Sequence, residues 1–177
     1  MRTPWGQSQH KKKIITGVNY HTTEGHGGFK VFKRLNALIP NEWRNENCWY
    51  EEDCEYCIPC MFIPAIKKED PELYACAVKT CKKWYPDIYE KVFNVILKEG
   101  ESYIKDEKQF YKDNENNLIG ISAVGLDGKV TVSATIGGER DYSNIRRFTI
   151  DEDKYLNRGR FGYVIQEEDL KNEIKKS

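Results

Sequence analysis

The chain has 177 residues, of which 39% are hydrophobic and 12% aromatic, so it is long and apolar enough to fold around a core. Its 28 Lys and Arg residues balance 28 Asp and Glu residues, which excludes a globally basic nucleic-acid-binding protein. No apolar run approaches the ~20 residues of a transmembrane helix, and residues 1–13 lack the apolar core of a signal peptide. We therefore expect a cytoplasmic protein with no membrane contact.

The zero net charge hides an uneven distribution of charge along the sequence. Residues 1–47 carry eight Lys and Arg against three Asp and Glu, whereas residues 48–60 carry four acids and no base. The basic part includes Lys11, Lys12 and Lys13. A run of charges is usually a solvated face, which is the first interpretation of these lysines, and a local phosphate contact is the alternative.

The first strands are predicted by β-branched and alternating side chains. Residues 13–20 are rich in Val, Ile and Thr, and residues 29–33 alternate apolar and polar side chains, so we expect these two strands to pair as a hairpin. Residues 21–28 connect them and contain His26 and three glycines, which allow positive φ or a close approach of the backbone. Loops of this kind often carry function.

Three helices are expected next. Residues 47–63 show a helical pattern in which Asn47 is the cap, the acids lie in the first turn, and Pro59 kinks the helix or ends it early. Residues 70–84 are predicted to be helical because an Asp-Pro pair supplies a cap and then proline at the first helical position. Residues 86–97 also begin with proline and carry an apolar stripe that includes Val95 and Ile96.

Six cysteines lie between Cys48 and Cys81. Cys54, Cys57 and Cys60 are spaced three apart, and thiolates bind zinc and iron–sulfur clusters in groups of four, so a metal site is one interpretation. The spacing lacks the two C-x2-C pairs of a zinc knuckle, and no His lies among the cysteines. We favour small apolar residues on packed helices, and we expect neither a metal ion nor another cofactor.

The pattern changes in the second half of the chain. Residues 98–117 are polar and predict a marginal helix or a linker. Residues 118–136 follow a period of two that is interrupted by Asp127-Gly128, which predicts a hairpin with a type I′ turn and a buried face that extends to Ile136. The remaining predicted elements are strands at 146–150 and 160–165 and an amphipathic helix at 166–176.

Together these elements predict an α+β protein, in which an N-terminal β-hairpin packed with three helices is followed by a small antiparallel β-rich module and a terminal helix. We expect residues 3–97 to form one domain and residues 98–117 to form the polar helix or linker. Residues 118–177 are expected to form the β-rich module.

The second half also concentrates arginine. Residues 158–163 (RGRFGY) are similar to the basic–Gly–aromatic strand of RNA-recognition domains, but the spacing is off by one residue, which favours a core strand with a glycine bend. Five arginines lie within residues 140–160, and they fit a phosphate-binding or base-binding face and a set of surface salt bridges equally well. They are Arg140, Arg146, Arg147, Arg158 and Arg160.

A histidine and three acids supply the residue types of a metal site or of acid–base catalysis. His26 lies on the glycine-rich loop. Glu51, Glu52 and Asp53 are expected at a helix start, where each residue turns by about 100° from the last, so at most one carboxylate points at a given site. In the structural alternative, which we favour, the glycines allow tight backbone passage and a carboxylate caps loop N–H groups or pairs with Arg44.

Three motifs follow one another in the first half of the chain, and the region that carries them covers residues 3–97 and includes Trp84-Tyr85-Pro86-Asp87. The motifs are Thr3-Pro4-Trp5-Gly6, His26-Gly27-Gly28-Phe29 and Trp49-Tyr50-Glu51-Glu52-Asp53-Cys54. In order and spacing these motifs resemble a domain family of unknown function that is common on bacterial plasmids and in phages.

Some small proteins of mobile elements with sequences of this kind act against host defence. The sequence is similar to an anti-CRISPR inhibitor of Cas9. This resemblance implies an accessory binding protein, rather than an enzyme, that docks on Cas9 with its guide RNA or on nucleic acid. The alternatives are a metal-assisted hydrolase or nuclease centred on His26 and residues 51–53, and a DNA-binding module. The expected binding residues are Trp5, Lys11, Lys12, Lys13, His26, Glu51, Glu52, Asp53, Arg146, Arg147, Arg158 and Arg160.

Overall fold

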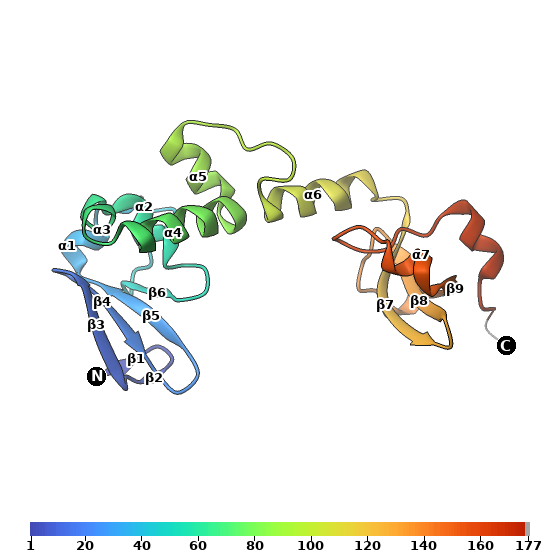
Figure 1. Ribbon diagram of the computed structural model, residues 1–177, viewed down its shortest axis with the longest axis horizontal. Coiled ribbons are helices and arrows are strands. Elements are labelled where there is room, and N and C mark those ends of the chain that lie inside the picture. The colour runs from blue at the N-terminus through green and yellow to red at the C-terminus, as the bar shows by residue number, and fades with distance from the viewer. Residues whose placement is uncertain (176–177) are drawn as a thin grey trace. The chain divides into compact units, whose positions relative to one another are not determined.

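The computed structural model describes residues 1–175 and divides the chain into two compact units, Met1–Ile104 and Lys105–Ser177 (Figure 1). Strands and helices occur in both units, so the predicted α+β class is confirmed. No helix within the described residues has the length and apolar character needed to cross a membrane.

Unit 1 contains a two-stranded hairpin, β1-β2, and a four-stranded antiparallel sheet in the order β3-β4-β5-β6. One face of the larger sheet packs against helices, and the other face is covered in part by the β1-β2 hairpin. The strands are β1 (Arg2–Thr3), β2 (Gly6–Gln7), β3 (His10–Ile15), β4 (Val18–Thr22), β5 (Gly27–Val31) and β6 (Trp49–Glu51).

The expected strand at residues 13–20 is wrong in extent, because the chain reverses within it. Gly17 has a φ of +93°, and the turn around it separates β3 from β4. Only glycine adopts that φ without strain, so the turn is set by one residue inside a β-branched run. The hairpin expected with residues 29–33 is present as β4 paired with β5, from Val18 opposite Val31 onward.

Helices α4 and α5 begin at the prolines that the sequence indicates, Pro71 and Pro86. The side chain of Asp70 accepts a hydrogen bond from the backbone N–H of Leu73 at 2.9 Å, so it caps α4. Helix α5 ends at Asn94, which adopts φ +50°, so the predicted extension to Leu97 is wrong and Ile96 is 85% exposed. The helices are α1 (Lys33–Asn36), α2 (Cys57–Phe62), α3 (Pro64–Glu69), α4 (Pro71–Trp84) and α5 (Pro86–Phe93).

The helix expected at residues 47–63 is wrong over its first half. Residues 49–51 form β6, and a turn separates them from α2, which begins at Cys57. Strand pairing prevails because it buries Tyr50 completely, on the helix-covered face of the sheet. Pro59 lies in the first turn of α2, where its missing N–H would have no helical partner, so it does not break the helix.

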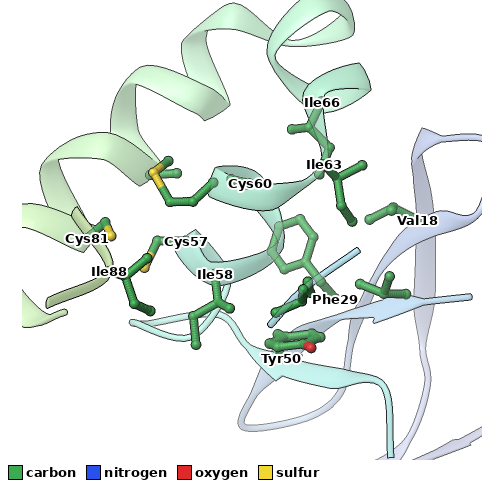
Figure 2. Packing of buried hydrophobic residues seen from close by; sticks show 14 of the residues in the cluster. Val18, Phe29, Tyr50, Cys57, Ile58, Cys60, Ile63, Ile66, Cys81 and Ile88 are labelled. Atoms are coloured by element: carbon green, nitrogen blue, oxygen red, sulfur yellow. The ribbon is translucent and has the colours of Figure 1, made fainter. Parts of the chain in front are cut away.

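The core of unit 1 lies between this sheet and the helices (Figure 2). Cys57, Cys60 and Cys81 are buried among isoleucine and aromatic side chains, as expected for small apolar residues on packed helices. A hydrogen bond with Cys81 and burial raise the pKa of the Cys57 thiol, and burial raises the pKa of Cys60 to about 12. Cys76, in contrast, is exposed, and all six thiols are free.

Unit 2 is built on a three-stranded antiparallel sheet in the order β7-β8-β9. Asp127 and Gly128 both have positive φ, at 51° and 74°, which confirms the predicted type I′ turn between β7 and β8. Val132 and Phe148 form the centre of its core. The elements are α6 (Tyr103–Asp113), which begins at the end of unit 1, and then β7 (Leu118–Leu126), β8 (Lys129–Ile136), η1 (Tyr142–Asn144), β9 (Arg146–Asp151), α7 (Glu152–Leu156) and η2 (Glu167–Asn172).

Three expectations for unit 2 are corrected. Residues 160–165 form no strand, because contact with β7 is limited to an isolated bridge between Val164 and Ile119. The terminal helix is a 3-10 helix at Glu167–Asn172, and the predicted end at Lys176 lies outside the described residues. Ile136 is 63% exposed, so the buried face of β8 ends before it.

Candidate functional site

A cleft of about 690 Å³ lies in unit 1, and we call it the Trp5 cleft. Three segments form it: the turn between β1 and β2, the loop at residues 41–48, and β6 with the turn that follows. The residues that line it are Pro4, Trp5, Arg44, Asn45, Glu46, Asn47, Trp49, Glu51 and Glu55.

The turn between β1 and β2 presents Trp5 to the cleft. The Thr3 hydroxyl donates to the carbonyl of Gly6 at 3.0 Å and accepts from the N–H of Trp5 at 3.2 Å, which closes the turn. The indole of Trp5 then lies over Gly28, where a Cβ atom would collide with it. The Gly-Gly sequence of β5 therefore makes room for an aromatic ring.

Trp49 forms the other aromatic wall of the cleft. Its ring meets that of Trp5 edge-on, with 5.8 Å between the ring centroids, and that of His21 edge-on at 5.3 Å. The Lys30 ammonium lies 5.0 Å from the centroid of Trp49 and donates to the carbonyl of Asn47 at 2.8 Å. These contacts hold Trp49 in one orientation.

His21 supports Trp49. It is buried, and its Nδ1 lies 2.9 Å from the Ser8 hydroxyl. Burial lowers the pKa of His21, and the positive charge of Lys11 on the neighbouring strand lowers it further.

Two carboxylates that line the cleft are held by hydrogen bonds to neighbouring groups. Glu51 Oε2 accepts from the N–H groups of Asp53 and Cys54, at 2.7 and 3.3 Å. Glu55 Oε2 accepts from Asn45 Nδ2 and from the N–H of Glu51, both at 3.1 Å. A carboxylate thus caps backbone N–H groups, but they belong to β6 and the turn after it and not to the glycine-rich loop, where the cap was expected.

One oxygen in this arrangement has no partner. Among the residues that the structure describes, Glu51 Oε1 is the buried side-chain atom that makes no hydrogen bond. A buried acceptor left in this state costs about 1–3 kcal/mol, so such an atom needs a reason. Its position in a residue that lines the cleft directs attention to a ligand with N–H donors.

Glu52 lies on the other side of the sheet from Glu51. Its carboxylate accepts a hydrogen bond from the Tyr20 hydroxyl. Burial and this bond raise the pKa of Tyr20 to about 12. Glu51 ends strand β6 and Glu52 begins the turn that follows, in place of the expected helix, and Asp53 is exposed in the same turn.

The other predicted site residues of unit 1 lie outside the Trp5 cleft. His26 is exposed in the turn between β4 and β5, and its backbone exchanges hydrogen bonds with Thr23. In the described part of the chain, no contact joins its imidazole to a carboxylate of residues 51–53. Lys11, Lys12 and Lys13 are exposed on β3, an edge strand of the sheet.

The arginines of unit 2 divide between the two interpretations. Arg146 makes a two-bond contact with Glu173, at 2.7 and 2.6 Å, and so belongs to a salt bridge. Arg158 stacks 4.3 Å above the ring of Tyr155, and Arg160 lies 5.7 Å from that of Phe161. Arg147 is exposed.

Two predicted residues, Trp5 and Glu51, therefore meet in one cleft. The expected binding set omitted the loop at residues 44–47, Trp49 and Glu55. A signal for residues 44–47 was present, because the stretch that contains them, Asn41 to Asn47 (NEWRNEN), is polar apart from one tryptophan. Within residues 1–175, no three His, Cys, Asp or Glu side chains gather closely enough to hold a metal ion.

Comparison with known proteins places the chain in a family. No curated protein and no solved structure matches the sequence. A family model described as a domain of unknown function, DUF7007, matches residues 1–115, which include the whole of unit 1. The chain therefore belongs to the DUF7007 family.

Proposed function

We propose that this protein is an accessory binding protein of a phage or plasmid, and that it inhibits a host nuclease of the Cas9 type in the cytoplasm by docking on it without catalysis. The observation that carries this proposal is the Trp5 cleft, which two tryptophans and three carboxylates line, and one of these carboxylates, that of Glu51, has a buried oxygen without a hydrogen bond. The likeness of the sequence motifs to a plasmid and phage domain supports the mobile-element setting.

The lining of the cleft favours a cationic guest. Three carboxylates face one guanidinium, that of Arg44, which already donates to the side chain of Asn41. Aromatic faces attract cations, and a lysine or arginine side chain brings several N–H donors to carboxylate groups. Arginine that enters a desolvated aromatic pocket is a common anchor of protein interfaces.

A nuclease that holds a guide RNA supplies such a guest. Its nucleic-acid channel is positively charged, because it must neutralise phosphates. A protein that offers carboxylates and tryptophans to the same lysines and arginines competes with the nucleic acid for them. The position of His26 also supports binding over hydrolysis. The enzyme hypothesis pairs this histidine with the acids of residues 51–53, and in the described part of the chain its imidazole contacts none of them.

The test is a cleavage assay with Cas9 and its guide RNA, together with a native gel. We expect the protein to slow cleavage and to shift the Cas9 band. Glu46→Lys reverses a charge on the exposed rim of the cleft and should weaken inhibition about tenfold, because opposed charges at the rim become like charges. Glu99→Lys makes the same change at an exposed site outside the cleft and should leave inhibition unchanged.

The outcomes separate two claims. Unchanged cleavage and no shift at excess protein would contradict Cas9 inhibition. Inhibition that Glu46→Lys and Glu99→Lys reduce equally would leave inhibition standing and show that the Trp5 cleft is not the docking site.

A further inference from the structure

Strand β7 exposes one edge over half of its length. Its other edge pairs with β8 from Leu118 to Leu126, with a bulge between Gly120 and Ser122. At the start of β7, residues 118–120 are also covered on the free side, where the N–H of Gly120 donates to the carbonyl of Tyr163 and the N–H of Ile165 donates to the carbonyl of Leu118, both at 2.8 Å. Within the described part of the chain, no backbone hydrogen bond covers the free side of residues 122–126, which are exposed.

This open edge lacks the usual protection against strand pairing. Natural edge strands carry charges, especially lysine, which oppose the addition of another strand. The edge strand β3 of unit 1 follows this rule with three consecutive lysines. Strand β7 has no charged residue or proline, and it exposes Val124 by 70% and Leu126 by 74%.

The register of the hairpin fixes which backbone groups face outward. Leu126 and Lys129 flank a two-residue turn, so they form a hydrogen-bonded pair, and such pairs alternate along the ladder. The N–H and C=O groups of Ala123 and Gly125 therefore point away from β8. The side chain of Val124 stands on the face opposite to buried Val132, which pairs with Ala123.

We propose that a second copy of this chain pairs with the open edge, β7 against β7, through a two-fold axis at Val124. In this register Ala123 of one copy forms a hydrogen-bonded pair with Gly125 of the other, and the reverse pair forms by symmetry. Val124 then faces Val124 of the second copy as a close pair without hydrogen bonds. The two three-stranded sheets become one sheet of six strands.

The second copy fits this edge because it is uncharged along the same residues. A strand that carries Lys or Glu would place a charge beside Val124 and Leu126, where nothing on β7 can pair with it. The identical strand instead supplies apolar side chains opposite apolar side chains, together with outward groups in matching positions. The contact is small, so we expect a dimer that depends on protein concentration.

Light scattering on the full chain, over a range of protein concentrations, measures this association. We expect the mass to rise from the monomer value of 20.7 kDa toward twice that value. Val124→Lys places two ammonium groups at the axis and should raise the dissociation constant at least tenfold. The control Ile96→Lys makes the same exchange at a residue that is even more exposed, in unit 1, and should associate like the wild type.

Two further variants distinguish strand pairing from a general loss of apolar surface. Val124→Glu alone should also be monomeric, whereas an equal mixture of Val124→Glu and Val124→Lys should recover a dimer through the opposite charges. Ala123→Pro removes an outward N–H that β8 does not use, so it should block the dimer while circular dichroism shows the fold retained. A wild type that stays monomeric at every concentration, or a Val124→Lys variant that associates as well as the wild type, would overturn the proposal.

Discussion

The position of Trp5 depends on Gly28, a residue without a side chain. A Cβ atom at Gly28 would lie 2.7 Å from the backbone oxygen of Tyr50, and closer still to the indole ring of Trp5. Real Cβ contacts do not reach such distances without movement of a neighbour. The backbone φ of Gly28 is not in the left-handed region, so its conformation does not require glycine. Packing against Trp5 and Tyr50 does.

We expect Gly28→Ala to lower the free energy of unfolding of unit 1 by about 1–3 kcal/mol, the usual range for overpacking a buried site. Urea unfolding followed by tryptophan fluorescence measures this change. Gly25→Ala is a matched control in the adjacent turn, since a Cβ there meets no atom within 4 Å, and it should change the free energy by less than about 0.5 kcal/mol. Equal effects of the two substitutions would contradict the packing role of Gly28.

Burial of Tyr20 and its hydrogen bond to Glu52 make the free energy of unfolding fall at alkaline pH. The pKa of Tyr20 is raised from 10.0 to about 12 in the folded protein, so the stabilising contribution is complete below pH 10 and is lost as pH rises through 12. We expect the stability difference between wild type and Tyr20→Phe to shrink from pH 9 to pH 11. Urea unfolding at each pH measures it.

Tyr142→Phe is the control for the removal of a tyrosine hydroxyl, because Tyr142 is 71% exposed. At pH 9 it should change the free energy of unfolding by less than Tyr20→Phe does. A Tyr20→Phe difference that stays constant from pH 9 to pH 11 would show that burial and the contact with Glu52 do not stabilise the neutral hydroxyl.

At the scale of single elements, Asp70 sets the start of α4. Its carboxylate accepts from the N–H of Leu73, and Pro71 occupies the position where no N–H is needed. We expect Asp70→Ala to reduce the free energy of unfolding by about 1 kcal/mol. Glu69→Ala removes an adjacent exposed carboxylate that caps no helix, and a thermal or urea unfolding curve should show a smaller loss for it.

Elements with local signals were predictable from the sequence. The cap and proline of α4, the proline of α5 and the Asp127-Gly128 turn each act through residues within a few positions, and each was found where expected. The helix expected at residues 47–63 failed because the competing force was not local. Tyr50 is drawn into the sheet by pairing with Phe29, which lies 21 residues earlier.

For the candidate site, single residues were predictable from the sequence but their arrangement was not. Trp5 and Glu51 stand out as residue types, and their motifs mark them. Their meeting in one cleft depends on the register that sets Gly28 opposite Glu51, with Trp5 resting on Gly28. No spacing in the sequence predicts that register. The loop at residues 44–47 could therefore not be placed beside Trp5 and Glu51 in advance.

At the scale of the whole molecule, the two units have separate cores. The core of unit 1 contains residues from Ile15 to Ile88, and that of unit 2 contains residues from Val130 to Ile165. The four tryptophans, at positions 5, 43, 49 and 84, all belong to unit 1. Tryptophan fluorescence therefore reports on one unit, whereas far-ultraviolet circular dichroism reports on both.

This separation yields a prediction for Phe148→Ala, which empties the centre of the core of unit 2. A fully buried Phe truncated to Ala usually costs about 3–5 kcal/mol, and the loss should fall on unit 2 alone, because Phe148 contributes to no other core. In urea, circular dichroism should show an additional transition at lower concentration, while the fluorescence midpoint stays at the wild-type value. Ile66→Ala, at a fully buried residue of unit 1, should do the reverse and lower the fluorescence midpoint. If Phe148→Ala lowers the fluorescence midpoint as much as Ile66→Ala does, the two cores unfold as one cooperative unit, and the division of the chain at residue 104 has no thermodynamic counterpart.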